Sequence, residues 1–168
     1  MADRRSAGPA PAWPRAGTRG GLALFELVVV MVILALMGAI AAPRVSNLLR
    51  RQRLDLASRR LMADLGLVRN MAIRDQADRK MVLSTVGGFY SLPEYLVAGA
   101  AYRVQFNTAP FEGVQLRSVS YAPTEVVFNR LGLPQAGGTI VLGDGVERVN
   151  VSLSAASGRA TRTFQAGP

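Results

Sequence analysis

Residues 20–43 read GGLALFELVVVMVILALMGAIAAP, a nearly continuous apolar run with one acidic residue. Residues 22–42 are apolar except for Glu26, and as a helix they would span about 32 Å. That length matches the roughly 30 Å hydrocarbon core of a bilayer, so the sequence predicts a membrane-spanning helix with a kink or boundary at Pro43. A carboxylate inside lipid is costly, so Glu26 marks a functional position that needs a partner.

Three interpretations of this stretch differ in whether the chain is cut and at which position. A secretory signal peptide could be cut after Ala39-Ile40-Ala41, but its apolar region is usually only about 7–15 residues long. A plain membrane anchor leaves Glu26 without a purpose. If the chain is cut between Gly21 and Leu22, the new amino group of Leu22 lies one helical turn from Glu26 and can neutralise it, within one chain or between neighbours.

The chain divides into four segments by composition and hydrophobic period. Residues 1–21, rich in Ala, Pro, Gly and Arg, are predicted to be a cytoplasmic leader without secondary structure. Residues 22–43 form the transmembrane helix, and residues 44–78 continue it as an amphipathic helix. The apolar residues at helical spacing are Leu54, Ala57, Leu61, Leu65, Val68 and Ala72. Residues 79–168 are predicted to form a β-rich globular domain.

Apolar and polar residues alternate from residue 79 onward, which indicates strands. Strands are expected at 79–86, 101–106, 113–119, 124–129, 138–143, 146–153 and 159–164, and a loop is expected at 92–100. Asp144-Gly145 predicts a hairpin with a type I′ turn. The fold class is therefore α+β, with the amphipathic half of a long helix packed on an antiparallel β domain.

The composition argues against an enzyme. The 168 residues include no histidine and no cysteine, which removes imidazole bases, thiolate nucleophiles and thiolate metal sites. The acidic residues of the C-terminal half are scattered, and no glycine-rich phosphate loop opens a helix. They are Glu94, Glu112, Glu125, Asp144 and Glu147. We therefore expect no catalytic activity, no cofactor and no metal.

The positive charge is concentrated next to the apolar stretch. The chain has 20 Lys and Arg against 11 Asp and Glu, a net charge of +9. Residues 44–80 hold ten basic and four acidic side chains, whereas residues 81–168 hold six and five. A basic band there favours contact with anionic membrane lipid, or is a solvated helix face. Counts of Arg on the two flanks alone would not predict a C-terminal part outside the inner membrane.

The segment GGLALFELVVV (20–30) resembles the class III signal of type IV pilins and type II secretion pseudopilins. Gly21 matches the last leader position, Leu22 the first mature position and Glu26 the fifth. Pro43 falls at mature position 22, where this family often has proline. The first, second and fourth mature residues are Leu, Ala and Phe here, in place of the usual Phe, Thr and Ile.

The resemblance implies a processing step and an assembly step. A prepilin peptidase would cut after Gly21 and methylate the new amine of Leu22. Glu26 would set the register in which the helix assembles with other pilin-like subunits on an inner-membrane secretion platform. The protein would then be a single-pass protein of the bacterial inner membrane, with residues 79–168 in the periplasm.

Three C-terminal segments resemble the H-type (GspH/FimT-like) minor pseudopilins of type II secretion. They are Val126, Phe128 and Gly132; Gly138, Ile140 and Leu142; and Gly158 with Arg159. This resemblance implies a structural subunit of a secretion pseudopilus, which takes part in protein export across the outer membrane. The alternative is a FimT-like minor pilin of a type IV pilus, which could bind DNA during uptake.

The DNA-binding alternative depends on the tail residues Arg159 and Arg162. FimT-like DNA binders resemble one another in a Gly-Arg-x-Arg tail, and here the second arginine comes one residue late. In a strand, Arg159 and Arg162 would point to opposite faces, whereas phosphate contacts need several cations on one surface. Residues 81–168 carry a net charge of only +1. We therefore expect no nucleic acid partner.

Overall fold

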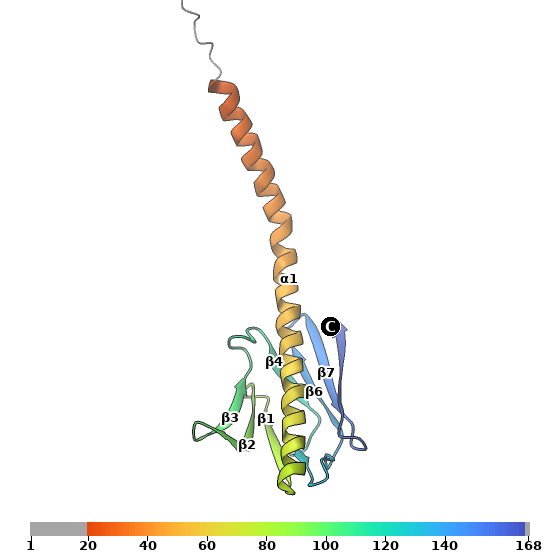
Figure 1. The fold of residues 1–168 in the computed structure, drawn as a ribbon. Coiled ribbons are helices and arrows are strands. Elements are labelled where there is room, and N and C mark those ends of the chain that lie inside the picture. Colours follow the sequence, from red (N-terminus) through yellow and green to blue (C-terminus); the bar gives the residue numbers. More distant parts are fainter. Residues whose placement is uncertain (1–19, 167–168) are drawn as a thin grey trace, which may run out of the picture. The chain divides into compact units, whose positions relative to one another are not determined.

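The computed structural model describes residues 20–166, and residues 1–19 and 167–168 lie outside the described part of the chain (Figure 1). The elements are α1 (Gly20–Asp75), β1 (Arg79–Ser84), β2 (Phe89–Val97), β3 (Ala100–Gln105), β4 (Gln115–Val119), β5 (Glu125–Phe128), β6 (Gly138–Gly143), β7 (Glu147–Leu153) and β8 (Ala160–Ala166). The chain forms two units, Met1–Pro43 and Arg44–Pro168. The second unit holds both sheets.

The eight strands form two antiparallel sheets, with the strand orders β3-β2-β1-β5 and β4-β6-β7-β8. In Figure 1, β1, β2 and β3 lie on one side of the lower part of α1, and β6 and β7 lie on the other. One core cluster joins α1 to both sheets, and it includes Leu61, Tyr90 and Val151. The predicted α+β class, a long N-terminal helix packed on antiparallel strands, is confirmed.

The amphipathic half of α1 buries the apolar stripe that the sequence predicts. All six residues of the stripe are at most 1% exposed, from Leu54 to Ala72. Side chains at this spacing share one face of a helix, so the stripe can pack against both sheets at once. Burial of a Leu or Val side chain contributes about 1.5–3 kcal/mol, which makes this face the main attachment of α1 to the sheets.

The loop expected at residues 92–100 is wrong, because β2 runs from Phe89 to Val97 and pairs with β3. Tyr90 and Leu92 are buried on the inner face of this strand. The pairing register shifts between Leu92 and Leu96. A bulge of this kind tolerates Pro93, which has no N–H to donate to the ladder.

The hairpin expected at Asp144-Gly145 joins β6 to β7, but the predicted type I′ turn is wrong. Type I′ needs a positive φ at both central residues, and of these two only Gly145 has one, at 92°. The Asp144 carboxylate accepts hydrogen bonds from the backbone N–H groups of Val146 (2.9 Å) and Glu147 (2.7 Å). This local side-chain turn holds Asp144 at a negative φ.

Candidate functional site

The side chains of α1 between residues 24 and 39 are exposed all around the helix, although most of them are large and apolar. Leu24 and Phe25 are each 68% exposed. Within the described residues, one helix is long and apolar enough to cross a membrane. So large an apolar surface is unfavourable in water, so this length of α1 needs lipid or neighbouring helices around it.

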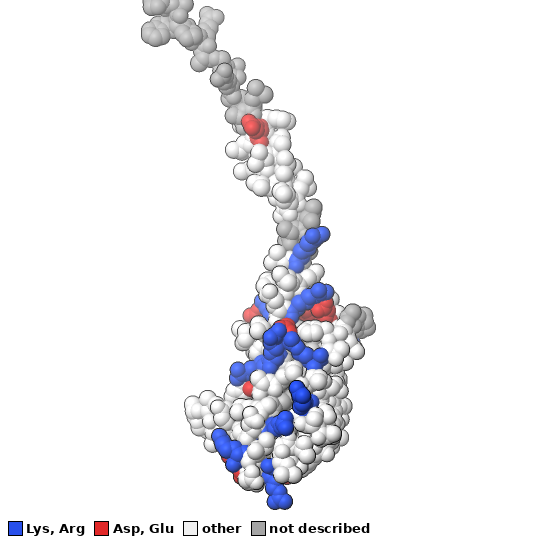
Figure 2. Space-filling view, turned by 45° about the vertical axis from the view of Figure 1, so that its right-hand side comes forward, with Lys and Arg blue, Asp and Glu red and all other residues white. Residues whose placement is uncertain are grey.

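Glu26 is the one acidic side chain in this apolar length. Figure 2 shows that charged side chains are sparse along the upper part of the described chain, which is mostly white, and gather over the lower part. No residue that the structure describes forms an ion pair with it. Helical spacing places position 26 on the same face as position 22, one turn away. The backbone of Gly21 and Leu22 belongs to α1, but their side chains and the leader 1–19 lie outside what the structure describes.

Arg159 and Arg162 lie in different environments. Arg162 in β8 donates hydrogen bonds to the Asp55 carboxylate and to Ser58 Oγ (3.3 Å), both on α1. Arg159 precedes β8, is exposed and forms no ion pair with a described residue. The positive charge of Arg162 is thus already balanced within the domain.

A buried carboxylate that the sequence analysis missed joins α1 to the first sheet. Asp64 is 4% exposed, and its Oδ2 accepts hydrogen bonds from the hydroxyls of Tyr90 (2.6 Å) and Tyr102 (3.0 Å) and from Arg60 Nε (3.2 Å). Burial raises the pKa of Tyr90 above its usual range, and the hydrogen bond to Asp64 raises it further. A sequence signal existed, because Asp64 lies beside Leu65 on the apolar face, where a carboxylate needs partners.

Most of the scattered acidic residues have structural partners. Three ion pairs join distant segments: Arg51–Glu147 at 2.6 Å, Arg53–Glu112 at 3.2 Å and Lys80–Glu125 at 3.3 Å. Asp144 closes the β6–β7 turn, and Glu94 is exposed on β2. Among the described residues, no three His, Cys, Asp or Glu side chains gather in a way that could hold a metal ion.

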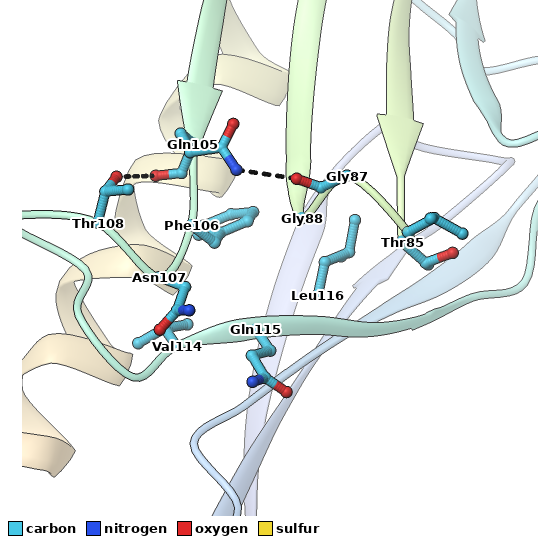
Figure 3. Close-up of a pocket in the computed structure, with 11 residues that line it drawn as sticks. Thr85, Gly87, Gly88, Gln105, Phe106, Asn107, Thr108, Val114, Gln115 and Leu116 are labelled. Atoms are coloured by element: carbon cyan, nitrogen blue, oxygen red, sulfur yellow. Dashed lines mark hydrogen bonds between the residues drawn. The ribbon is translucent and has the colours of Figure 1, made fainter.

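A cavity of about 400 Å³ lies where the ends of β1 and β3 face the start of β4 (Figure 3). Gln105 Nε2 donates to the Gly87 carbonyl at 2.8 Å, and Thr108 Oγ1 donates to the Gln105 carbonyl at 3.2 Å. The lining has amide, hydroxyl and apolar groups but no charged side chain. It is formed by Thr85, Val86, Gly87, Gly88, Gln105, Phe106, Asn107, Thr108, Val114, Gln115 and Leu116. These groups can hydrogen bond with a neutral molecule but offer no acid or base near neutral pH.

No protein-family model and no curated protein matches this sequence. Two crystal forms of the type IV minor pilin FimU of Pseudomonas aeruginosa are similar in structure. The first has 19% identity and a TM-score of 0.48 over 70% of this chain and 90% of FimU. The second has 18% identity and a TM-score of 0.46 over 68% and 93%. The minor pseudopilin EpsH of the Type 2 Secretion System of Vibrio cholerae is similar at 16% identity and a TM-score of 0.45, over 68% of this chain and 97% of EpsH.

Proposed function

We propose that this chain is a structural subunit of the H-type minor pseudopilin kind, which assembles in a type II secretion pseudopilus and takes part in protein export. The observation that carries the proposal is the apolar, exposed length of α1 with Glu26 near its start. The same helix continues into a face that is buried against two sheets. One element thus provides both an assembly segment and the support of a globular domain.

Glu26 has a specific role in this proposal. A prepilin peptidase cuts after Gly21 and methylates the amine of Leu22, so the mature chain begins with a cation one turn from the carboxylate. In lipid, the unpaired carboxylate is unfavourable, and pairing with the amine of a neighbouring subunit removes that penalty. The pair therefore fixes the axial register between helices. Residues 79–168 face the periplasm, and membrane lipid and the inner-membrane secretion platform are further partners.

The mature N-terminus tests the processing step. We expect the intact mass of the membrane-extracted protein to correspond to a methylated chain that begins at Leu22. A chain that begins at Ala42, or an uncut chain that begins at Met1, would overturn the proposal.

The Glu26→Leu variant tests the assembly step. We expect it to keep the circular dichroism of the folded domain but to lose most of its co-purification with other pilin-like subunits from native membranes. Val29→Leu is the matched control, because it changes the same segment without touching the carboxylate, and it should assemble normally. Normal assembly of Glu26→Leu would contradict the proposed pairing.

The alternative, a FimT-like minor pilin that binds DNA, needs Arg159 and Arg162 as phosphate contacts. The ion pair between Arg162 and Asp55 disfavours this role, because the guanidinium is already neutralised. Salt-dependent DNA binding by the full chain that is lost in the Arg159→Ala/Arg162→Ala double variant would favour the alternative.

A further inference from the structure

Four arginines at the end of the second unit where α1 enters it form no ion pair with a described residue. All four side chains are exposed, and they are Arg44 and Arg50 in α1, Arg117 in β4 and Arg148 in β7. The acidic groups of this end already have partners. Glu147 pairs with Arg51 at 2.6 Å, and Glu112 pairs with Arg53 at 3.2 Å. Asp144 accepts two backbone hydrogen bonds in the β6–β7 turn, so the charge left at this end is positive.

Arg117 and Arg148 lie side by side over Gly143, the last residue of β6. A Cβ atom on Gly143 would lie 3.3 Å from Arg117 Cγ and 3.5 Å from Arg148 Cγ. A Cβ atom on Gly145, in the β6–β7 turn, would lie 3.8 Å from Arg117 Nη2, so this guanidinium group lies beside the turn. Cationic side chains that stand next to each other repel unless an anion is near. The pair therefore suits a partner with negative charge.

The β6–β7 turn and α1 meet at a recess of about 110 Å³ that contains both charged and apolar groups. It is lined by Asn47, Arg50, Arg51, Asp144, Val146 and Glu147. Val146 is 55% exposed, and Phe164 in β8, which lines a neighbouring recess with Arg51 and Glu147, is 47% exposed. Exposed apolar side chains among arginines suit the interface of an anionic bilayer. We call the following residues the basic rim: Arg44, Arg50, Arg117, Val146, Arg148 and Phe164.

The position of the basic rim in the chain keeps it close to the membrane-spanning segment. Asn47 follows Ala42, the last residue of the apolar run, by five positions, so the two are at most about 18 Å apart even in an extended chain. This bound holds at any angle between the two units. The headgroup layer on each side of a hydrocarbon core is about 5–8 Å thick, and long arginine side chains extend the reach of the rim toward it. Ile73, by contrast, lies about 39 Å farther along α1 than Asn47.

We propose that the basic rim binds the anionic phospholipid headgroups of the bilayer in which α1 is anchored. Its arginines donate hydrogen bonds to lipid phosphates, while Val146 and Phe164 enter the interfacial layer. A membrane presents many phosphates, so the arginines need to face one surface and do not need to share one anion. This inference rests on the proposed function, in which the apolar length of α1 spans a bilayer. The contact needs a single copy of the chain and holds its domain against the membrane before the subunit assembles.

A fluorescent label at one position tests the contact directly, because the natural chain has no cysteine. The full chain with Val146→Cys is labelled and reconstituted in vesicles that carry a quencher on their headgroups, made of phosphatidylcholine alone or of a mixture with phosphatidylglycerol. We expect about threefold stronger quenching in the anionic vesicles. Leu131→Cys is the control, because Leu131 is 68% exposed, precedes Gly132 beside Ile73, and should be quenched little in both. A Val146 label quenched no more than the Leu131 label, or equally in both vesicles, would overturn the proposal.

Removal of charge from the labelled Val146→Cys chain tests the chemistry. We expect Arg117→Gln with Arg148→Gln to lower the quenching in anionic vesicles to the level seen in phosphatidylcholine. Arg130→Gln with Arg159→Gln is the matched control, because it removes two exposed arginines next to the contact between Gly132 and Gly158, and it should have no effect. Circular dichroism of each variant checks folding. Equal effects of the two pairs, or no effect of the first, would overturn the proposal.

The two proposals fail in different ways. If assembly depends on Glu26 but the Val146 label is not quenched, the lipid contact is wrong and the proposed function stands. If the label is quenched but the chain remains uncut at Gly21 and does not assemble, the proposed function is wrong and the lipid contact stands. Nucleic acid also offers phosphates, but it has no apolar layer for Val146 and Phe164. DNA binding that is lost in Arg117→Gln with Arg148→Gln, without quenching by lipid, would identify nucleic acid as the partner and overturn the proposal.

Discussion

Arg162 in β8 and Asp55 in α1 form a partly buried ion pair across 107 residues of sequence. The same Arg162 Nη1 lies 3.3 Å from Ser58 Oγ, and the Asp55 carboxylate also accepts a hydrogen bond from Arg59 Nε at 2.7 Å. The last strand of the fold is thus attached to its first element by a charge-assisted contact. Contacts of this type are stronger than neutral hydrogen bonds.

Removal of this pair should weaken the domain. We expect Arg162→Ala to lower the free energy of unfolding by about 1 kcal/mol, a value kept small because both side chains are partly solvated. Urea unfolding of the detergent-solubilised chain, followed by circular dichroism, measures it. Arg159→Ala is the control and should change the free energy little, so equal losses from both variants would contradict the structural role of Arg162.

Acid should weaken the same contact. Burial raises the pKa of Asp55, but the hydrogen bonds and charges of Arg59 and Arg162 outweigh this and hold the pKa below its usual value of about 4. A carboxyl group with a lowered pKa stabilises the fold above its unfolded-state pKa, and the stabilisation is lost as pH falls through the folded-state pKa. Urea midpoints should therefore drop below about pH 4, and less so in Asp55→Asn. A Glu94→Gln control should follow the natural chain.

The Asp64 cluster should behave as a coupled unit. We expect Tyr90→Phe to cost about 1–2 kcal/mol, because it removes one of the three donors to the buried carboxylate. Asp64→Ala should cost about 3 kcal/mol, because it leaves the buried Tyr90 hydroxyl without an acceptor. Since both changes break the same hydrogen bond, the double variant should lose less than the sum of the two. Urea unfolding of the three variants gives the coupling energy, and strict additivity would mean that the bond contributes nothing.

Replacement of Tyr121 by Phe should not destabilise the fold, in contrast to the same replacement at Tyr90. Its hydroxyl is buried and forms no hydrogen bond with a described residue, and burial raises its pKa to about 12. Removal of a hydroxyl that has lost water without gaining a partner should not destabilise the fold. We expect Tyr121→Phe to leave the free energy of unfolding within about 0.5 kcal/mol of the natural chain or to raise it. A loss as large as that of Tyr90→Phe would show a missing partner.

A comparison of alanine substitutions at Gly132 and Gly99 distinguishes the cost of steric contact from the cost of backbone strain. Both have a positive φ, +74° and +82°, but an added Cβ atom meets Ile73 only at Gly132 and open space at Gly99. We expect Gly99→Ala to cost about 1 kcal/mol for the left-handed backbone, and Gly132→Ala to cost at least about 2 kcal/mol. Thermal unfolding of the two variants measures the difference, and equal costs would mean that Ile73 moves aside freely.

The parts of this fold that sequence predicts are those set by local spacing. The stripe from Leu54 to Ala72 repeats at helical period, and most strands alternate clearly, so both could be recognised without knowledge of their partners. β2 was missed because Pro93 and Gly99 are loop signals, and only Tyr90 and Leu92 alternate before the bulge. The two-sheet arrangement depends on pairing between distant strands, which no local pattern specifies.

The same distinction between local patterns and contacts of distant segments applies to the candidate sites. Glu26 can be recognised because a carboxylate in an apolar run is visible within a few residues of sequence. The partners of Asp64 and Arg162 come from other elements, so their hydrogen bonds cannot be predicted from spacing. Arg69 shows no signal at all in the sequence, because it is distinguished only by a buried Nε atom from which no described residue accepts a hydrogen bond.

The contact between α1 and β8 also determines when the domain can finish folding during synthesis. A chain that emerges from the ribosome carries the apolar face of α1 for about a hundred residues before β8 exists to complete the second sheet. Loops of this length close slowly compared with the formation of a helix or a hairpin. The domain therefore completes its fold only after its final strand has been synthesised, and until then the apolar face of α1 lacks part of its cover.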